Sequence, residues 1–221
     1  MPASNPDRMT IIKAALSAAR MSTYEAATST AGAEALELYV WNARMSAAFL
    51  GPLHICEVVL RNCAANAIEA VYGPRWPWSP GFETSLPHPQ AGYSPKFDLQ
   101  IVRHKHSVTG GVISDLKFAF WQQLFTRRHD HRIWNNHLFQ VMPGSQAGCE
   151  VRSIVKAVYA DLETIRRLRN RIAHHEPIFH RDLAREFDLI AALIGQTCPT
   201  TAGWMRYHYE TDIRTLLSTR P

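Results

Sequence analysis

The densest group of side chains able to do acid–base or phosphate chemistry lies within residues 166–176, in the string RRLRNRIAHHE. Four arginines and two histidines fall within its first ten positions. An arginine fork suits phosphate oxygens, and a histidine, with an ordinary pKa of about 6.5, transfers protons near neutrality. The composition therefore indicates a site for a phosphate-bearing ligand. A solvated basic helix end, stabilised by the helix dipole, is the alternative.

The spacing within this segment sorts its side chains onto faces of a helix. Asn170 and His174 are four residues apart, so they share one face. Arg169 follows Ile165 by four positions and precedes Ile172 by three, which places it at the edge of an apolar row. A guanidinium at the edge of a core needs a partner, because an unpaired buried charge is costly.

Two side chains of an earlier helix are the expected partners. Glu57 lies within or beside an apolar row of that helix, and Arg61 follows it at i+4. We expect this carboxylate and this arginine to orient Arg169 or His174. An ordinary intrahelical pair between Glu57 and Arg61, which would contribute little to stability, is the alternative.

The elements expected to carry these residues are helices, because apolar residues recur at spacings of three and four and no strand alternation is present. The predicted helices cover residues 8–20, 34–50, 53–72, 114–128, 146–174, 181–194 and 201–217, with a shorter element over 131–143. Gly51-Pro52 is expected to separate the second helix from the third, with Pro52 in the first turn of the latter. The predicted fold class is therefore all-α.

Two apolar rows define the predicted core. The row of the helix over 34–50 comprises Leu36, Val40, Ala43, Ala47 and Leu50. The row of the helix over 146–174 comprises Val151, Ile154, Val155, Val158, Leu162, Ile165, Leu168 and Ile172. Each row forms a stripe that a helix buries against its neighbours.

The chain is expected to divide into an N-terminal helix and linker over residues 1–33 and one helical domain over residues 34–221. Within that domain we expect a long irregular excursion at about 73–111. RWPWSP and SLPHPQAGYSP are rich in proline, which regular helix excludes, and long loops of this kind are often functional. With 221 residues and 46% hydrophobic composition, the chain suffices for a buried core.

Composition also indicates the cellular location of the protein and the kind of partner it binds. No apolar stretch reaches the roughly 18 residues of a membrane span, and the N-terminus lacks the apolar region of a signal peptide. We therefore expect a cytoplasmic protein that does not associate with a membrane. The four cysteines form no CxxC pair, which favours buried free thiols in a reducing compartment. A formal charge of +5 and a pI of about 9.2 are compatible with a phosphate-bearing partner.

Three segments together resemble one protein family. RNRIAH (169–174) fits the Arg-Asn-x-x-x-His signature of the HEPN superfamily, many of whose members are RNases. The longer string LRNRIAHHEPIF (168–179) is similar to the hallmark of the Abi-like abortive-infection proteins of bacteria. ICEVVLRN (55–62) and FAFWQQLFTRRHDHRIW (118–134) resemble two earlier elements of that family, in the family's order.

The resemblance implies a HEPN-like helical bundle, built round an up-down four-helix core with additional helices, in which two chains bring their motifs together at a dimer interface. Carried over to this sequence, Arg169 would contact the scissile phosphate of RNA and Asn170 would hold the loop or the ribose-phosphate. His174 would serve as general acid or base. The residues expected to support them are Glu57, Arg61, His175 and Glu176, and those expected to bind the RNA backbone are Arg166, Arg171, Arg127 and Arg128.

The implied activity is metal-independent cleavage of RNA by its own 2′-hydroxyl, giving 2′,3′-cyclic phosphate ends. The sequence holds no HExxH or Cys/His ligand spacing, and no cofactor is expected. The expected role is bacterial antiviral abortive infection or growth arrest like that of a toxin–antitoxin system. RNA, a second copy of the chain and an antitoxin or regulatory protein are the expected partners. Two alternatives stay open: a non-catalytic RNA-binding or sensing HEPN module, and a helical protein-interaction subunit.

Overall fold

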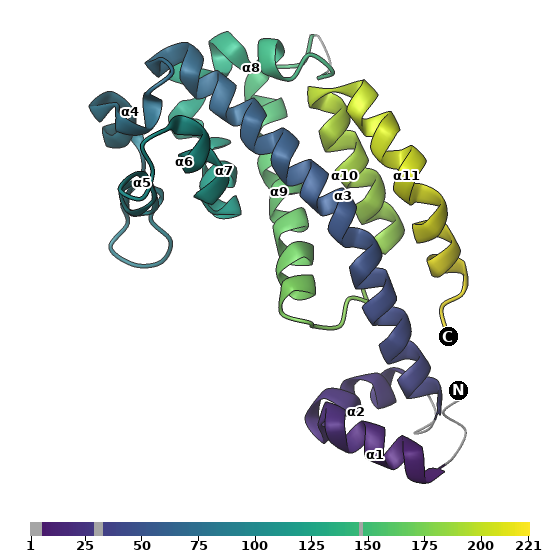
Figure 1. Ribbon diagram of the computed structural model, residues 1–221. Helices are drawn as coiled ribbons and strands as arrows, with labels where there is room; N and C mark the ends of the chain where they lie inside the picture. The colour runs from purple at the N-terminus through teal and green to yellow at the C-terminus, as the bar shows by residue number, and fades with distance from the viewer. Residues whose placement is uncertain (1–5, 29–32, 146–147) are drawn as a thin grey trace.

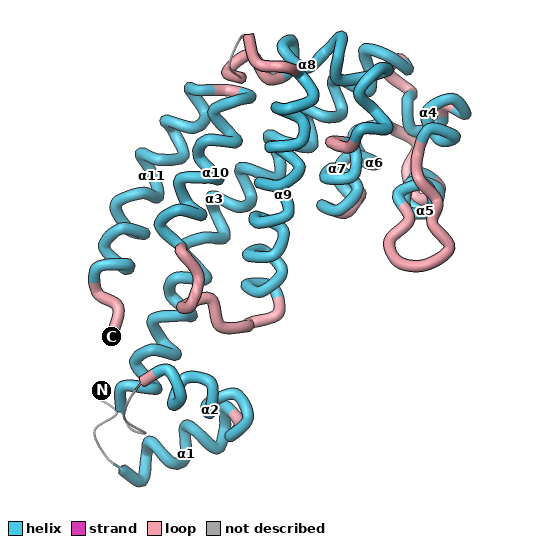
Figure 2. The backbone as a smooth tube through the Cα atoms, turned by 180° about the vertical axis from the view of Figure 1, so that it is seen from behind, coloured by secondary structure: helices cyan, strands magenta, loops and turns pink. Residues whose placement is uncertain are grey.

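The computed structural model of the chain describes residues 6–28, 33–145 and 148–221. Within them every regular element is a helix (Figures 1 and 2), which confirms the all-α prediction. The α-helices are α1 (Pro6–Leu16), α2 (Ala18–Ala27), α3 (Ala33–Tyr72), α4 (Pro80–Ser85), α5 (Pro95–Arg103), α6 (Thr109–Asp115), α7 (Phe118–Leu124), α8 (Asn135–Val141), α9 (Val151–Ala173), α10 (Leu183–Thr197) and α11 (Pro199–Ser218). Two short 3-10 helices, η1 (Trp76–Trp78) and η2 (Arg127–His129), and one π-helix, η3 (Asp130–Trp134), complete the set.

Four long helices form the body of the molecule. α10 packs against α11, α3 and α9, and α11 also packs along α3. Large apolar side chains fill the space between them, among them Phe49 of α3, Leu162 of α9 and Phe187 of α10, all fully buried. The helices α4 to α7 lie at one end of α3, and α1 and α2 lie at the other (Figure 1). The end of α9 that carries the arginines and histidines points into the region between these two groups.

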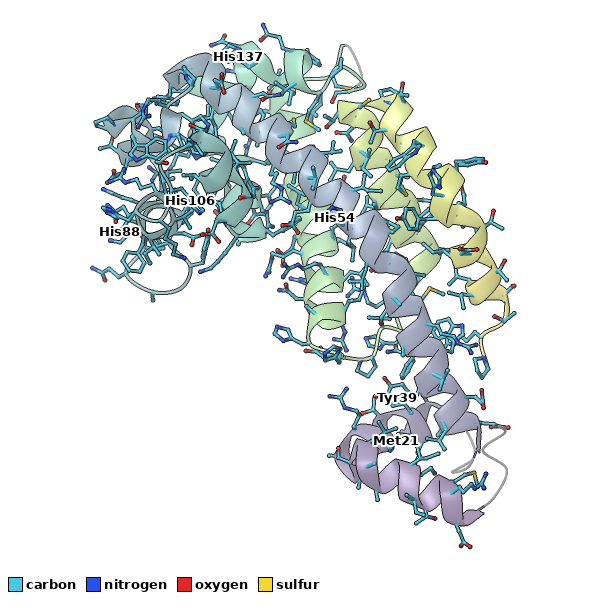
Figure 3. The ribbon with its side chains drawn as sticks, in the orientation of Figure 1. Met21, Tyr39, His54, His88, His106 and His137 are labelled. Atoms are coloured by element: carbon cyan, nitrogen blue, oxygen red, sulfur yellow. The ribbon has the colours of Figure 1, made fainter. Side chains whose placement is uncertain are left out.

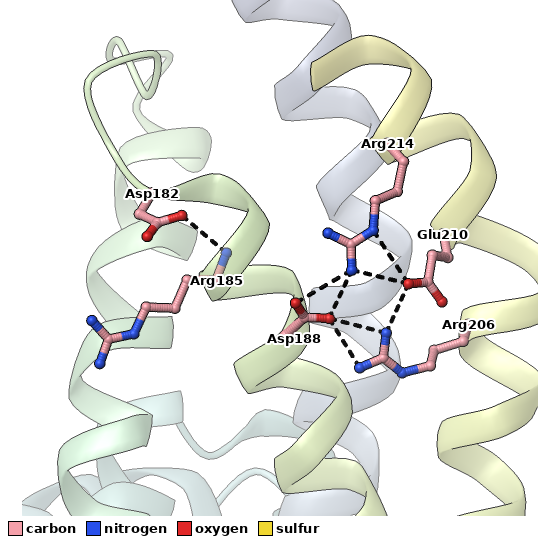
Figure 4. Close-up of polar contacts among 6 residues, drawn as sticks. All are labelled: Asp182, Arg185, Asp188, Arg206, Glu210 and Arg214. Atoms are coloured by element: carbon pink, nitrogen blue, oxygen red, sulfur yellow. Dashed lines mark hydrogen bonds and ion pairs between the residues drawn. The ribbon is translucent and has the colours of Figure 1, made fainter. Parts of the chain in front are cut away.

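An ion-pair network joins α10 to α11 at the surface (Figure 4). Asp188 Oδ1 accepts hydrogen bonds from Arg206 and Arg214, each at 3.0 Å. Glu210 Oε1 accepts from the same two arginines, also at 3.0 Å. A single exposed pair contributes little to stability, but a network of four groups fixes how the two helices lie along each other.

The predicted break at Gly51-Pro52 is wrong, because α3 runs unbroken through both residues. Proline in a helix interior removes one hydrogen bond and costs about 3 kcal/mol. Packing offsets this cost at this point. Pro52 is buried, and a Cβ atom placed on Gly51 would lie 2.4 Å from the ring of Tyr209. Gly51 therefore serves the close approach of α11 to α3, not the end of a helix.

The predicted buried row of residues 34–50 is wrong for four of its five members. Leu36 is buried, but Val40 is 42% exposed and Leu50 is 56% exposed, and Ala43 and Ala47 are also exposed. The neighbouring stripe faces the core instead, and its buried members are Leu38, Trp41, Met45, Phe49 and Leu53. Both stripes are apolar, so periodicity alone did not identify the one that α10 and α11 cover.

The predicted irregular excursion at 73–111 is confirmed only in part. It folds into η1, α4, α5 and the start of α6, whereas SLPHPQAGYSP (85–95) is a loop apart from its first and last residues. Pro77, Pro80 and Pro95 lie in the first turns of helices, whereas Pro87 and Pro89 lie in a loop. Pro80 and Pro95 occupy the first positions of α4 and α5, where a missing N–H costs nothing. Ser79 and Ser94 cap these helices, their hydroxyls accepting the N–H of Phe82 and Phe97. Non-helical chain remains at 73–75, 79, 86–94 and 104–108.

The middle of the chain is more divided than predicted. The single helix expected over 114–128 is two helices, because α6 ends at Asp115 and α7 covers only Phe118–Leu124. The element expected over 131–143 is η3 followed by α8, ending before Pro143. The long helix α9 confirms the one predicted over 146–174, although it begins at Val151. Gln146 and Ala147 lie outside the described residues.

The N-terminal segment is more ordered than a helix with a linker. α2 occupies much of the predicted linker, and its Met21 and Tyr24 are buried. Figure 3 labels Met21 on α2 and Tyr39 on the start of α3. The Tyr24 ring lies 5.1 Å from the ring of Tyr39 on α3 and 5.3 Å from that of Phe179. Residues 29–32, also part of the predicted linker, lie outside the described residues. α2 is therefore attached to the same region as the end of α9.

The structure also bears on the predictions about membrane association and the cysteines. α3 is long and apolar enough to cross a membrane by length and composition alone, with a mean hydropathy of 1.3 in its most apolar stretch. The core helix of a globular protein has the same properties, so this is weak evidence, and the absence of a membrane stays a prediction. Cys56 and Cys63 are buried free thiols as predicted, whereas Cys149 is exposed.

Candidate functional site

The RNRIAH segment forms the last turn of α9 and the residue that follows it. The helix ends here because Pro177 follows closely and disfavours helical geometry before it. His174 ends the helix, and its backbone N–H donates to the Asn170 carbonyl at 2.9 Å. His175 has a φ of 55°, a left-handed conformation that residues other than glycine adopt infrequently. The chain thus turns sharply directly after His174.

Two arginines hold this turn. Arg171 Nε donates to the Pro177 carbonyl at 2.9 Å, and its Nη1 lies 3.4 Å from the Glu176 carboxylate. Arg20 of α2 donates to the His175 carbonyl at 2.5 Å. In one chain, therefore, Arg171 and Glu176 stabilise the backbone after α9, and neither lines the cavity described next.

A polar cavity of about 400 Å³ opens beside the last turns of α9. Arg166, Arg169 and Asn170 of α9 line one side of it. Glu57 of α3 and residues 114–119, at the junction of α6 and α7, line the rest. The structure thus brings two arginines, a lysine (Lys117), an amide and two carboxylates (Glu57 and Asp115) to one solvent-accessible space from distant parts of the sequence.

The predicted contact between Glu57 and Arg169 is present, with Glu57 Oε2 4.0 Å from Arg169 Nε. The Arg169 side chain is 47% exposed, so its guanidinium stays accessible to a ligand. The alternative pair of Glu57 with Arg61 is not found among the ion pairs of the described residues. Arg61 instead donates to the Ser114 carbonyl at 3.2 Å, which fixes the end of α6 at the far wall of the cavity.

One carboxylate, Glu163, organises the arginines one turn earlier. It accepts two hydrogen bonds from Arg166, at 2.9 and 3.0 Å, one from Arg167 at 2.7 Å and one from Gln122 of α7 at 2.9 Å. These hydrogen bonds, above all those from Arg166, lower the pKa of Glu163 to about 2. Arg166 therefore faces the cavity from a fixed position, although part of its charge is already balanced.

The two histidines lie outside this cavity. His174 is exposed, and its side chain makes no hydrogen bond to the described residues. His175 lines a separate, mostly apolar groove of about 350 Å³, whose walls include Tyr24 of α2, Tyr39 of α3 and Ile172 of α9. In a single chain, Arg169 and Asn170 therefore share a cavity, and His174 lies one turn beyond Asn170 at the open end of the helix.

The structure does not bring Arg127 and Arg128 to this site. Arg127 lines a cavity together with Arg152, at the start of α9. Arg152 and Arg169 are 17 residues apart, which on an α-helix is about 25 Å. Arg128 donates to the Ser85 carbonyl at 3.3 Å and lines another hollow, beside Tyr93. An RNA backbone contact by either arginine would be separate from the Arg169 cavity.

Sequence reasoning missed two residues that shape the site. Glu163 precedes Arg166 and Arg167 by three and four positions, a spacing from which its ion pairs are predictable. Arg20 donates to the His175 carbonyl although the two residues are 155 positions apart, and no local sequence pattern predicts such a contact. Among the described residues, no group of three His, Cys, Asp or Glu side chains is arranged to hold a metal ion.

Comparison of the chain with models of protein families, with curated proteins and with solved structures found no match. The resemblance to Abi-like HEPN proteins therefore depends on the quoted motifs alone.

Proposed function

We propose that the chain is a metal-independent endoribonuclease of the HEPN type, with its cleavage site at the end of α9. The observation that carries the proposal is the cavity shared by Arg169, Asn170, Arg166 and Glu57. An arginine that is held by a carboxylate and half-exposed is suited to a phosphate, because its planar fork matches phosphate oxygens. RNA is the phosphate ligand that the resemblance names.

The reaction needs little from the protein because RNA supplies its own nucleophile. The 2′-oxygen attacks the adjacent phosphorus, the bond from phosphorus to the 5′-oxygen breaks, and a 2′,3′-cyclic phosphate and a 5′-hydroxyl result. One proton leaves the 2′-hydroxyl and another reaches the 5′-oxygen. Arg169 would stabilise the negative charge that builds on the phosphate, and His174 would transfer a proton.

The count of proton-transfer groups supports a homodimer. The reaction has a general base and a general acid, yet only one motif histidine, His174, follows Asn170 on its face of α9. A second copy would supply the other. Beside the groove that His175 lines, α3 exposes an apolar stripe formed by Val40, Ala43, Ala47 and Leu50. We expect the second copy to cover this stripe and so bring both copies of the motif together.

Purified protein incubated with single-stranded RNA in EDTA tests the proposal. Wild type should cleave, whereas Arg169→Ala and His174→Ala should lose about 100-fold or more in rate, as removal of a charge-stabilising or proton-transfer group does. Arg167→Ala is the matched control. It removes the same charge from the same helix, but Arg167 is 67% exposed and does not line the cavity. Cleavage that needs a divalent metal would contradict the mechanism.

A non-catalytic RNA-binding module is the second candidate, and the position of His174 outside the cavity favours it. Tight RNA binding by wild type without cleavage would support this function. Dimer loss in both variants with no effect on RNA would instead indicate a protein-interaction subunit. Within the first proposal, expression in a bacterial cytoplasm should arrest growth unless an antitoxin or regulatory partner restrains the chain, and His174→Ala should relieve the arrest.

A further inference from the structure

A second polar cavity lies at the opposite end of α9 from Arg169. It has a volume of about 650 Å³ and is formed by Arg127, the π-helix η3, the start of α8 and the start of α9. π-Helices are rare and occur often at functional sites. The side chains around the cavity are all polar or charged apart from Val151; they are Arg127, Asp130, His131, Asn135, Glu150 and Arg152.

Asp130 is the feature of this cavity that needs a ligand to explain it. The residue is only 8% exposed, and its Oδ2 lies 3.3 Å from Arg152 Nη1 as an ion pair. Its other oxygen, Oδ1, is buried and accepts no hydrogen bond from the described residues, and Arg152 Nη1 donates none. Both atoms are buried, and a buried polar atom without a hydrogen bond costs about 1–3 kcal/mol. An unsatisfied acceptor and an unsatisfied donor therefore lie side by side at the wall of the cavity, where a shift of the 39% exposed Arg152 side chain would open them to a ligand.

Arg127 and the start of α9 offer donors for an anionic group near Asp130. Arg127 and Arg152 are matched in formal charge by Asp130 and Glu150, so the donors and not a net charge would select the anion. Arg127 is exposed at the cavity, with no hydrogen bond or ion pair from its side chain to the described residues. The first N–H groups of α9 also face this end, because the opening turn of a helix has no intrahelical acceptors for them. The side chain of Glu150, at the cap position, makes no hydrogen bond to them. An arginine beside a helix N-terminus is an arrangement that binds phosphate.

We propose that this cavity is a nucleotide-binding site that takes guanosine. The phosphate would lie against Arg127 and the N-terminus of α9. The base edge would lie against the Asp130–Arg152 pair. Guanine presents N–H donors at N1 and N2 directly beside the O6 acceptor, so a single edge satisfies a carboxylate and a guanidinium together. Adenine and cytosine offer only one donor group beside their acceptor, and uracil has no amino group.

The site lies about 25 Å along α9 from Arg169, so it is separate from the cleavage cavity. A single strand of RNA that reaches both would be held by an unpaired guanosine here while another nucleotide lies at Arg169. The proposal that the guanosine belongs to an RNA strand rests on the proposed ribonuclease function. A free guanine nucleotide would satisfy the same side chains, and the two sources are separated by experiment.

The test measures binding in the His174→Ala chain, so that cleavage does not interfere. Calorimetric titration with GMP, AMP, CMP and UMP tests the free nucleotide. Fluorescence anisotropy with short labelled RNAs that contain one guanosine or one adenosine tests the strand. We expect guanosine to bind about tenfold or more tightly than adenosine, which is the discrimination a well-placed base contact gives. Binding of the RNA without binding of GMP assigns the site to a strand, and binding of both assigns it to the nucleotide itself.

Three variants tie the binding to the cavity. Asp130→Asn should weaken guanosine binding about tenfold, because one acceptor of the N–H groups becomes a donor. Arg127→Ala should weaken binding of all nucleotides and lower the salt dependence by about one charge. It keeps the test valid if Asp130→Asn fails to fold, since Arg127 makes no bond that folding needs. Lys156→Ala, an exposed cation one turn further along α9, is the control and should bind as the parent does.

Equal binding of all four nucleotides, no binding of any probe, or unchanged binding in both Asp130→Asn and Arg127→Ala would overturn the proposal. Its failure is distinguishable from failure of the proposed function. RNA cleavage by wild type with no guanosine preference removes this site alone. Guanosine binding that depends on Asp130, in a chain that never cleaves RNA, removes the ribonuclease and keeps the site.

Discussion

Arg169 is held by a weak contact, and that weakness suits the role proposed for it. Its ion pair with Glu57 spans 4.0 Å and is about half exposed, a kind of pair that contributes about 0–1 kcal/mol to stability. The Glu57 carboxylate thus orients the guanidinium without engaging all of its donors. A phosphate that approaches Arg169 would find free N–H groups already turned toward the cavity.

Glu57→Gln should separate the effect of Glu57 on the orientation of Arg169 from its effect on the stability of the fold. We expect it to lower the rate of RNA cleavage about three- to tenfold, because Arg169 loses its charged partner, and to change the melting temperature by less than about 3 °C. Cleavage assays and thermal denaturation monitored by circular dichroism measure the two effects. Glu69→Gln, an exposed glutamate on the same helix and outside the cavity, is the control. Equal loss of rate in both variants would show that the effect is not one of orientation.

His129 gives the fold a pH dependence of its own. Burial lowers its pKa from 6.5 to about 4, and the positive charges of Arg128 and Arg132 act in the same direction. The folded chain therefore keeps this imidazole neutral where the unfolded chain protonates it. Stability from this group is fully present above about pH 6.5 and is lost as the pH falls toward 4, by about 3 kcal/mol at about 1.4 kcal/mol per pKa unit.

Urea denaturation between pH 7.5 and 4.5 checks this expectation. The wild-type free energy of unfolding should fall steeply below pH 6.5, and His129→Gln should flatten that fall. His131→Gln, which removes an exposed histidine two residues away, should leave it unchanged. A wild-type slope that persists in His129→Gln would assign the pH dependence to other groups.

For single residues, the sequence predicted the contact that follows from helical periodicity and missed the contacts that depend on tertiary packing. The position of Arg169 at the edge of an apolar row indicated a partner, and Glu57 on α3 is beside it. The same reasoning did not find Arg20, because its contact with the His175 carbonyl depends on how α2 packs on α3. Nor did it find the unpartnered oxygen of Asp130, which depends on the turn geometry of η3.

For the helices, glycine and proline residues led to wrong predictions of helix ends where tertiary packing determines the structure. Gly51-Pro52 reads as the end of a helix, and Pro80 and Pro95 read as irregular chain. In the structure the first pair lies inside α3, where the glycine admits Tyr209 of α11, and the other two prolines begin helices. Helix α9 was predicted well because eight apolar residues recur along it; six of them are buried, and Val151 and Ile154 are partly buried. A long consistent pattern thus outweighs single residues as evidence.

Gly51→Ala tests the packing of α11 on α3. A Cβ atom there would lie 2.4 Å from the Tyr209 ring, so we expect a loss of about 1–3 kcal/mol despite the better helix propensity of alanine. Gly203→Ala in α11 is the matched control. Its Cβ would have no neighbour within 4 Å, so the same change should stabilise the chain by about 0.5–1 kcal/mol. Chemical denaturation of both variants gives the comparison, and a stabilised Gly51→Ala would contradict the described contact.

At the scale of the whole molecule, the proposed chemistry depends on two copies. One chain offers a cavity with Arg169 at its edge and a single exposed His174 beyond it, and an apolar stripe on α3 beside the end of α9 has no covering element among the described residues. Mixing wild type with an excess of His174→Ala should therefore suppress cleavage below the level expected from dilution, because mixed dimers have one histidine.

Leu50→Asp tests the same dependence on a dimer through the oligomeric state of the protein. A charge in the exposed α3 stripe should weaken dimer formation, since burying an unpaired carboxylate is costly, and should leave the monomer folded. Sedimentation velocity should then show a monomer, and the cleavage rate should fall in proportion. An active monomer would contradict the shared site.

The central claim is that the end of α9 catalyses attack of the RNA 2′-hydroxyl without a metal. The most direct measurement is mass spectrometry of the RNA ends produced by wild type in EDTA, beside the products of Arg169→Ala and His174→Ala. We expect 2′,3′-cyclic phosphate and 5′-hydroxyl ends from wild type and intact RNA from both variants. Ends bearing a 5′-phosphate and a 3′-hydroxyl, or cleavage that persists in both variants, would contradict this claim.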